Sequence, residues 1–353
     1  MKVALICPAN TLYMPYVHAY EKVLKEVNVD YTIINWDRLQ IEQEKNEYKY
    51  SDKKNIHQRN FLDYINYKRF IIKKLKETEY DKVVVFTLQL AYFIKGYLIS
   101  KYKHKYIIDI RDYNKIYKFT SFNRLIEYSD FTVISSPGYK MWLPESKKYV
   151  VNHNTPINDI KSVEPYNFKK QNGKVNISTI GFIRHWDANI NLVKNLKNDK
   201  EFNLIFHGEG TINEKLKYFV KENNIYNVQI NGRYKKEEES SLYKNASLIN
   251  MLLYNDMNSK GVLANRLYNA TIYGKPLLSL EGTYLAKQIK EYDLGLVLDS
   301  TDEIASEIKL YLQRFNHVEY EKGRISFLEK VIKDNEYFNL KLKEFVYDIN
   351  PVI

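Results

Sequence analysis

The sequence predicts an α/β protein with two doubly wound domains, each built on a parallel sheet. Short apolar segments alternate with segments of helical periodicity along the whole chain, as expected when helices connect parallel strands. The chain has 353 residues, which is more than one typical core holds. Its apolar content of 44% is enough to fill two cores.

In the first half, six apolar segments are expected to form strands: Lys2–Cys7, Val29–Trp36, Lys82–Phe86, Tyr106–Ile110, Phe131–Ser135 and Lys148–His153. Helices are expected over Tyr13–Glu26 and His57–Lys76, and a polar loop over Gln40–Asn55. This alternation predicts a parallel sheet with helices on both faces.

The second half repeats the pattern, with strands expected at Val175–Ile180, Phe202–Phe206, Val228–Ile230, Ser247–Leu253, Pro276–Leu280 and Leu296–Leu298. Before it, Lys161–Lys174 is polar and contains a Pro and a Gly, which is typical of an interdomain linker. The tail after Gly323 has a helical pattern to about Tyr347. We therefore expect domains over residues 1–160 and 175–322, and a helix over 323–353 that packs back on the first domain.

Composition limits the class of protein and its partners. The net charge of +11 favours an anionic partner, such as nucleotide phosphates, a polyanion or an acidic membrane, unless it reflects a general bias toward Lys, Asn, Ile and Tyr. The single cysteine, Cys7, cannot form an internal disulfide, which favours a reduced cytoplasm. The apolar runs Val3–Cys7 and Val83–Ile94 are too short for a signal peptide and a membrane span, respectively. We expect a cytoplasmic protein, peripheral at most to the inner face of the cell membrane.

The sequence contains neither the patterns of nucleic-acid-binding modules nor the spacing of metal ligands. It has no helix-turn-helix, zinc-finger or aromatic RNP pattern, so no nucleic-acid partner is expected. No His or Cys pair has metal-ligand spacing such as H-x-x-x-H or C-x-x-C, so no metal is expected.

Five segments at predicted strand ends resemble those of one enzyme class. They are G-F-I-R at Gly181–Arg184, H-G-E-G at His207–Gly210, N-G-R-Y at Asn231–Tyr234, N-R-L-Y-N-A-T-I-Y-G-K-P-L-L at Asn265–Leu278, and I-I-D-I-R-D-Y at Ile107–Tyr113. Together they resemble the GT-B glycosyltransferases, above all the family 4 and family 1-like bacterial enzymes of capsule, lipopolysaccharide and exopolysaccharide assembly. The resemblance implies two Rossmann-like domains facing across a cleft, the first for an acceptor and the second for a nucleoside-diphosphate sugar.

The sequence departs from that family at two places. The family's paired glutamates, eight residues apart, are replaced by Gly261 and Asn269. The Gly-Gly that follows the family's first strand is replaced by the segment Pro8–Thr11.

Two arginines are the expected phosphate ligands. Arg184 follows a strand and a Gly, where its fork could clamp a diphosphate and stabilise the charge on the leaving group; the alternative is a surface ion pair. Arg266 occupies the family's Lys position and could neutralise the second phosphate beside the helix start, or lie on a solvated helix face.

The remaining donor-site candidates are polar or glycine residues at strand ends and on one helix. The amide of Asn269, at the position of the ribose-binding glutamate, can accept from a hydroxyl, and Asn265 could share this role. Gly208 and Gly210 would let backbone approach the ligand, or form only a turn. His207 and His185 could touch sugar or phosphate, or be structural. The expected donor site comprises Gly181, Arg184, His207, Gly208, Gly210, Asn265, Arg266, Leu267 and Asn269.

The acceptor site is expected at strand ends of the first half. Asp112 is the candidate catalytic base, kept ionised by Arg111, and Asp109 lies on the same strand end. An Asp–Arg pair capping a helix is the alternative, and a retaining enzyme would need no base. Asn10 and Thr11, where the family has its Gly-rich acceptor loop, could contact the acceptor or the sugar. Asp112, Arg184 and Arg266 are therefore the expected catalytic residues.

The segment Tyr64–Lys76 carries five cations beside Tyr, Phe and Ile. It could dock on an anionic membrane near a lipid-linked acceptor, or it could be an ordinary amphipathic helix that covers a sheet.

We expect a glycosyltransferase that moves a sugar from a nucleoside-diphosphate sugar to a glycan, and the lipid-linked surface glycan is an analogy from the fold. A sugar-nucleotide epimerase on the same scaffold and a degenerate subunit that binds a glycan or a partner transferase remain alternatives.

Overall fold

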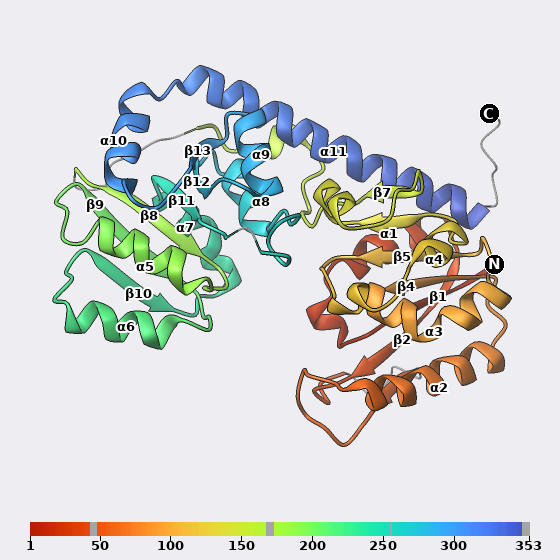
Figure 1. Ribbon diagram of the computed structural model, residues 1–353. Helices are drawn as coiled ribbons and strands as arrows, with labels where there is room; N and C mark the ends of the chain where they lie inside the picture. The colour runs from red at the N-terminus through yellow and green to blue at the C-terminus, as the bar shows by residue number, and fades with distance from the viewer. Residues whose placement is uncertain (43–47, 167–172, 255, 348–353) are drawn as a thin grey trace. The chain divides into compact units, whose positions relative to one another are not determined.

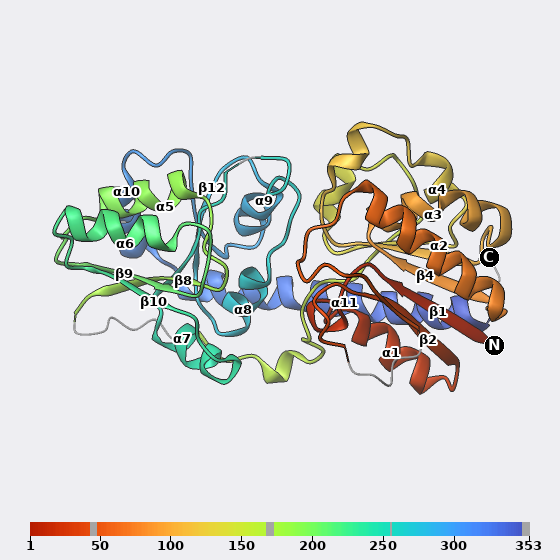
Figure 2. The same cartoon turned by 90° about the horizontal axis from the view of Figure 1, so that it is seen from below.

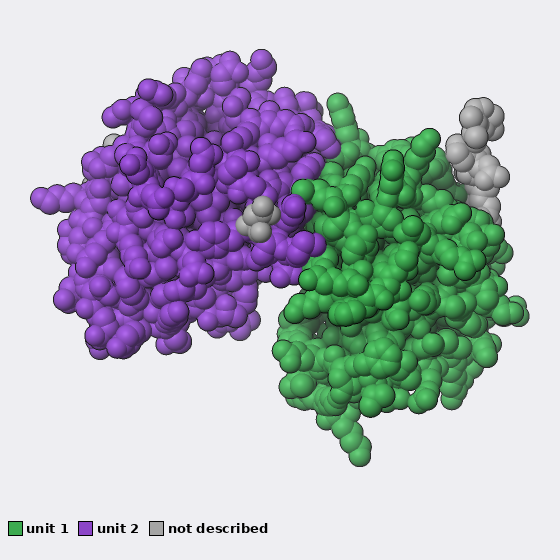
Figure 3. Space-filling model, viewed as in Figure 1, with its two compact units in different colours: residues 1–154, 333–353 green, residues 155–332 purple. Residues whose placement is uncertain are grey.

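The computed structural model describes residues 1–42, 48–166, 173–254 and 256–347. The chain divides into two compact units (Figure 3). Unit 1 comprises Met1–Asn154 and Lys333–Ile353, and unit 2 comprises Thr155–Ile332. The expected boundaries at 160 and 322 therefore lie inside unit 2. Of the expected linker, residues 167–172 lie outside the described residues, and residues 161–166 belong to unit 2.

Unit 1 is built on a seven-stranded parallel sheet with the order β3-β2-β1-β4-β5-β6-β7. The strands are β1 (Lys2–Cys7), β2 (Asp30–Asp37), β3 (Lys49–Ser51), β4 (Lys82–Phe86), β5 (Tyr106–Ile110), β6 (Thr132–Ile134) and β7 (Tyr149–Val151). Strands β4 and β5 are buried along their whole length, because helices cover both faces of a parallel sheet.

The helices of unit 1 lie on both sides of its sheet (Figures 1 and 2). They are α1 (Val17–Glu26), α2 (Phe61–Glu77), α3 (Leu88–Lys101) and α4 (Asn123–Glu127), with the 3-10 turns η1 (Thr11–Tyr13), η2 (Lys115–Lys118) and η3 (Pro137–Met141). Helix α1 and the end of α11 (His317–Tyr347) share one core with the sheet, and α2 and α3 lie on the opposite side.

Unit 2 is built on a six-stranded parallel sheet with the order β10-β9-β8-β11-β12-β13. The strands are β8 (Val175–Ile180), β9 (Phe202–His207), β10 (Val228–Gly232), β11 (Leu248–Met251), β12 (Leu277–Leu280) and β13 (Gly295–Leu298). Its helices are α5 (Trp186–Asn195), α6 (Asn213–Glu222), α7 (Glu239–Asn245), α8 (Asn265–Ile272), α9 (Tyr284–Glu291) and α10 (Ile304–Arg314), with the turns η4 (Ile160–Ser162) and η5 (Lys236–Glu238). The predicted fold class, two doubly wound parallel sheets, is confirmed.

Helix α11 contributes to the cores of both units. Phe327, Leu328 and Val331 are buried in unit 2. Further along, Phe338, Leu342, Phe345 and Val346 are buried in unit 1 with the sheet and α1. The helix begins at His317, six residues before the Gly323 at which the sequence pattern placed its start.

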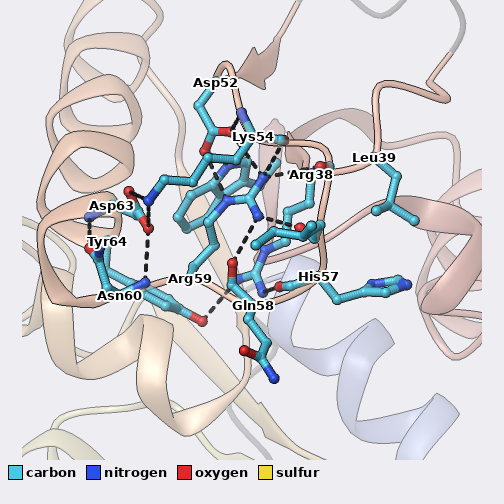
Figure 4. A network of polar contacts seen from close by, with 12 residues as sticks. Arg38, Leu39, Asp52, Lys54, His57, Gln58, Arg59, Asn60, Asp63 and Tyr64 are labelled. Atoms are coloured by element: carbon cyan, nitrogen blue, oxygen red, sulfur yellow. Dashed lines mark hydrogen bonds and ion pairs between the residues drawn. The ribbon is translucent and has the colours of Figure 1, made fainter.

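A polar network orders the segment between β3 and α2 in unit 1 (Figure 4). The guanidinium of Arg59 forms a bidentate pair with Asp52, with both distances 2.9 Å, and also donates to the backbone carbonyls of Lys54 and Gln58 in the segment and of Arg38 after β2. Asn60 and Asp63 then close a capping box that starts α2. This part of the chain is therefore held by side chains although it contains no regular secondary structure.

Candidate functional site

The two sheets place a ligand-binding position at the strands where the order reverses. In unit 2 this is between β8 and β11, because the chain continues from β8 to β9 on one side and returns to β11 on the other. Ligands of open parallel sheets bind beyond the carboxyl ends of such strands. Strand β8 ends at Ile180 and β11 at Met251, so the first turn of α8 and the segment after β8 are the elements to examine.

Arg266 is held at this position by backbone carbonyls. Its Nε donates to the oxygen of Ile180 at 2.5 Å, and its Nη1 donates to that of Asn250 at 2.9 Å. Burial lowers the pKa of the guanidinium, and no ion pair joins Arg266 to any residue in the described part of the chain. The structure thus fixes a half-buried cation at two strand ends, and no carboxylate of the described ranges neutralises it.

Arg184 is a second cation at the same place. It is exposed, it lowers the pKa of both Arg266 and His185, and among the described residues its side chain makes no hydrogen bond or ion pair. His185 has a φ of +63° at the start of α5, and its Nε2 is buried without a hydrogen-bond partner in the described structure. The carboxylate of Asp256 raises the pKa of His185, and its Oδ1 accepts from two backbone N–H groups of its own turn.

We call Arg184, Arg266 and the adjacent His185 the cationic cluster; its charge near pH 7 comes from the two arginines, because the pKa of His185 is lowered. Two like charges near one another repel unless an anion joins them, and a guanidinium forms bidentate hydrogen bonds with phosphate oxygens. The cluster is therefore suited to an anion with several oxygens, and the start of α5 adds backbone N–H groups.

The glycines near the cluster have structural reasons of their own. A Cβ at Gly208 would lie 1.9 Å from the Gly181 oxygen, and one at Gly210 would lie 1.8 Å from the Ile183 oxygen. The loop after β9 thus packs directly on the loop after β8, and this close approach requires the glycines. Gly181, with φ +102°, leaves space at its ideal Cβ position, where Arg266 Nη2 is 3.8 Å away.

Of the other donor-site candidates, one proves to be a core residue. Leu267 has no exposed surface and packs in the core of unit 2, so its side chain is not available to a nucleotide. Asn265 is exposed in the first turn of α8. His207 is half-buried at the end of β9, burial lowers its pKa, and its Nδ1 lies 3.3 Å from Asn231 Nδ2. Asn269 donates to Glu239 Oε1 at 3.1 Å.

Glu239 and Tyr234 are polar residues near the cluster that sequence reasoning did not select. The run Glu237–Glu239 is acidic, as is typical of a helix start, and Glu239 does begin α7. Its contact with Asn269 joins residues 30 positions apart, for which the sequence carries no signal.

In unit 1 the predicted acceptor residues Asp109 and Arg111 bind one another instead of facing solvent. Arg111 Nε and Nη2 donate to the two carboxylate oxygens of Asp109 at 2.6 Å each, and Tyr20 donates to the same carboxylate at 2.7 Å. Asp109 is fully buried and Arg111 is 7% exposed. Their burial and pairing argue against direct contact with an acceptor in this arrangement, and the effect of Arg111 on the ionisation of Asp112 stays a prediction. Asp112 is exposed just beyond this pair.

Asn10 is likewise a structural residue. It is 1% exposed, its Nδ2 donates to Asp37 Oδ1 at 2.6 Å, and its Oδ1 accepts from the N–H groups of Arg38 and Leu39. It thus ties the ends of β1 and β2 together and is unavailable to an acceptor. Thr11, half-buried at the start of η1, donates its N–H to Glu42 at 2.6 Å.

Helix α2 buries aromatic side chains of the segment for which the sequence suggested contact with a membrane. Tyr64, Tyr67, Ile71 and Leu75 are buried, and the Tyr67 hydroxyl donates to backbone oxygens of β1 and β2. The cations Arg69, Lys73 and Lys76 are exposed. The exposed apolar side chains are Phe61 (63%) and Leu62 (68%), at the start of the helix.

Metal-ligand clusters and membrane-spanning helices were sought over the described residues. No group of three or more His, Cys, Asp and Glu residues there could hold a metal ion. Within the same ranges, no helix is long and apolar enough to cross a membrane.

The fold can now be compared with those of known proteins. Solved glycosyltransferases of the GT-B fold match almost the whole chain, which therefore has that fold. No protein-family model and no curated sequence matches. Sucrose-phosphate synthase from Thermosynechococcus elongatus has a TM-score of 0.70 at 11% identity, over 99% of this chain and 98% of that one.

Two bacterial structures extend the comparison. HepE from Anabaena, in complex with UDP, has a TM-score of 0.70 at 10% identity, over 98% of this chain and all of that one. The lipopolysaccharide outer core galactosyltransferase WaaB has a TM-score of 0.66 at 16% identity, over 99% of each chain. HepE has also been solved with UDP-glucose. At these identities the likeness concerns the fold, and it confirms the fold that the strand-end segments suggested.

Proposed function

We propose that this protein is a glycosyltransferase that takes a sugar from a nucleoside-diphosphate sugar bound to unit 2. The observation that carries the proposal is the cationic cluster: two arginines at the reversal of the sheet order, neither paired with a carboxylate among the described residues. The GT-B fold and the UDP complexes of HepE support a nucleotide as the ligand.

The chemistry follows from the charges. A diphosphate that leaves an anomeric carbon gains negative charge as the bond breaks, and guanidinium groups already in place stabilise it without reorganisation. Arg266 is the preorganised member, because three backbone carbonyls accept from it. Arg184 is exposed and can reach a phosphate from solvent.

Unit 1 would bind the acceptor in this proposal, and Asp112 is the base candidate, because it is the exposed acid after β5. In this proposal the acceptor is a lipid-linked surface glycan. The protein acts in the cytoplasm, at an anionic membrane surface. The helix α2 would contribute its exposed cations to that surface, and Phe61 and Leu62 its apolar contact.

The test is ligand binding to the full chain. UDP, GDP, CDP, ADP and dTDP, and their common sugar conjugates, are added in a thermal-shift assay with and without Mg²⁺, since a ligand of the native state raises the melting temperature. Arg184→Gln should weaken binding of the best ligand about tenfold to a hundredfold, because a charge-assisted contact is lost.

Arg314→Gln is the matched control, since it removes an equally exposed arginine from the last turn of α10. The control should bind like the wild type. If no nucleotide raises the melting temperature, the proposal is wrong and the degenerate-subunit alternative is favoured. Equal losses in both variants would show only an effect of net charge.

A further inference from the structure

A second polar position lies beside the cationic cluster, around the carboxylate of Glu239. Its Oε1 accepts from Asn269 Nδ2 at 3.1 Å, and its Oε2 is paired with Lys236. The Glu239 side chain is 14% exposed, whereas that of Lys236 is 80% exposed and extends into solvent. The carboxylate is thus positioned by an amide from α8 and is only partly covered.

Glu239 and Asn269 line a pocket of about 350 Å³ in unit 2. The pocket has further polar walls from Asn158, Ser162 and Ser240, and apolar walls from Ile157, Ile272 and Tyr273. A carboxylate that merely starts a helix needs no such opening. Lys236 also lines the pocket, so a ligand inside it would lie next to all three of these side chains.

Tyr234 connects this pocket to the cationic cluster. Burial and the nearby carboxylate of Glu239 raise the pKa of its hydroxyl, so the two groups lie close to one another. The same hydroxyl is 4.0 Å from the ideal Cβ position of Gly181, and Arg266 Nη2 is 3.8 Å from that position. Asn269 also lies one helical turn after Arg266 on α8, on the same face. One extended ligand can therefore touch both places.

The cationic cluster and the Glu239 carboxylate carry opposite charges, so they favour different parts of a ligand. The cluster attracts phosphate, whereas the carboxylate of Glu239 repels it and accepts strongly from hydroxyl groups. The part of the ligand next to the phosphates must then be uncharged and rich in hydroxyl donors. A sugar ring with adjacent hydroxyls has these properties.

We propose that Glu239, oriented by Asn269, binds a vicinal diol of a sugar ring attached to the diphosphate. This inference rests on the proposed function. It assigns to α7 a carboxylate that discriminates between hydroxylated and deoxygenated ligands. The diol has two chemical sources, the ribose of the nucleotide and the sugar to be transferred.

The test compares each ligand with its deoxy counterpart in calorimetric titrations of the full chain. UDP, GDP, CDP and ADP are paired with their 2′-deoxy forms, and UDP-glucose is paired with UDP-2-deoxyglucose. Loss of one hydrogen bond to a carboxylate should weaken binding about tenfold to a hundredfold. Discrimination in the first set assigns the ribose, and discrimination in the second set alone assigns the transferred sugar.

The variant Glu239→Gln should bring the ratio between ligand and deoxy counterpart close to one, while the deoxy form itself keeps its affinity. Glu237→Gln is the matched control, since the same change is made on an exposed side chain of the same acidic run. The control should retain the wild-type ratio.

The outcomes separate this inference from the proposed function. If no nucleotide binds the wild type, the proposed function fails, and the diol site fails with it. If nucleotides bind and the wild type shows no discrimination in either set, only the diol site is wrong, and this holds even if Glu239→Gln does not fold. Discrimination that survives in Glu239→Gln would likewise overturn the role of Glu239.

Discussion

Replacing Asp109 with alanine should destabilise unit 1 strongly. The variant removes the acceptor of two 2.6 Å bonds from Arg111 and one 2.7 Å bond from Tyr20. Arg111 would stay buried with Asn152 as its remaining acceptor, through the backbone oxygen and Oδ1. Breaking a buried ion pair by removing one partner costs about 3–5 kcal/mol, because an uncompensated charge is left in a desolvated place.

This cost is measurable in the full chain. For a unit of this size, about 2–4 °C of melting temperature is lost per kcal/mol, so the midpoint of unit 1 should fall by roughly 6–20 °C. Two units need not unfold together. Trp36 and Trp142 lie in unit 1 and Trp186 in unit 2, so fluorescence in a Trp186→Phe background reports on unit 1 alone.

A double variant distinguishes charge from packing. Replacing both members with apolar residues of similar size, Asp109→Leu with Arg111→Met, removes the buried charges together and should recover much of the lost stability. A loss below about 1 kcal/mol in Asp109→Ala would refute the reasoning, since it would mean that water reaches Arg111. Unchanged stability with weakened binding of a glycan acceptor would restore the role that the sequence suggested for Asp109.

Two glycines and a histidine provide further tests. Gly210→Ala should destabilise unit 2 by about 3 kcal/mol or more, since its Cβ would lie 1.8 Å from the Ile183 oxygen, and an unchanged urea midpoint would contradict this. Gly96→Ala, exposed within α3 with nothing within 4 Å of the new methyl group, should instead raise stability by about 0.5–1 kcal/mol. The lowered pKa of His185 means that the unfolded state binds more protons, so its contribution to stability is full above about pH 6.5 and falls as the pH drops through this value. Asn tolerates the positive φ, so His185→Asn should lose less free energy of unfolding than the wild type between about pH 7 and 5, as measured by urea titrations. An equal loss in the variant and the wild type would contradict this.

The sequence by itself determined the buried strands and hence the fold. The bounds predicted for β1, β4, β5 and β8 are those observed. Strands covered on both faces tend to be apolar along their length, and β1, β4 and β5 are nearly continuous apolar runs that local composition reveals, whereas β8 alternates apolar with small polar residues. The polar strand β3 was missed inside the expected loop Gln40–Asn55, because three edge residues, only partly buried, carry no such run.

The tertiary structure alone decided which polar residues at strand ends are available to a ligand. Arg111 and Arg266 both lie at the end of a parallel strand, yet among the residues that the structure describes only Arg111 is paired with a carboxylate. The side chain of Asn10 is hydrogen-bonded to that of Asp37, 27 positions away in the sequence. Glu239 accepts a hydrogen bond from Asn269, 30 positions away. Composition and periodicity describe near neighbours along the chain, whereas the charge state and accessibility of a side chain depend on partners brought together by folding.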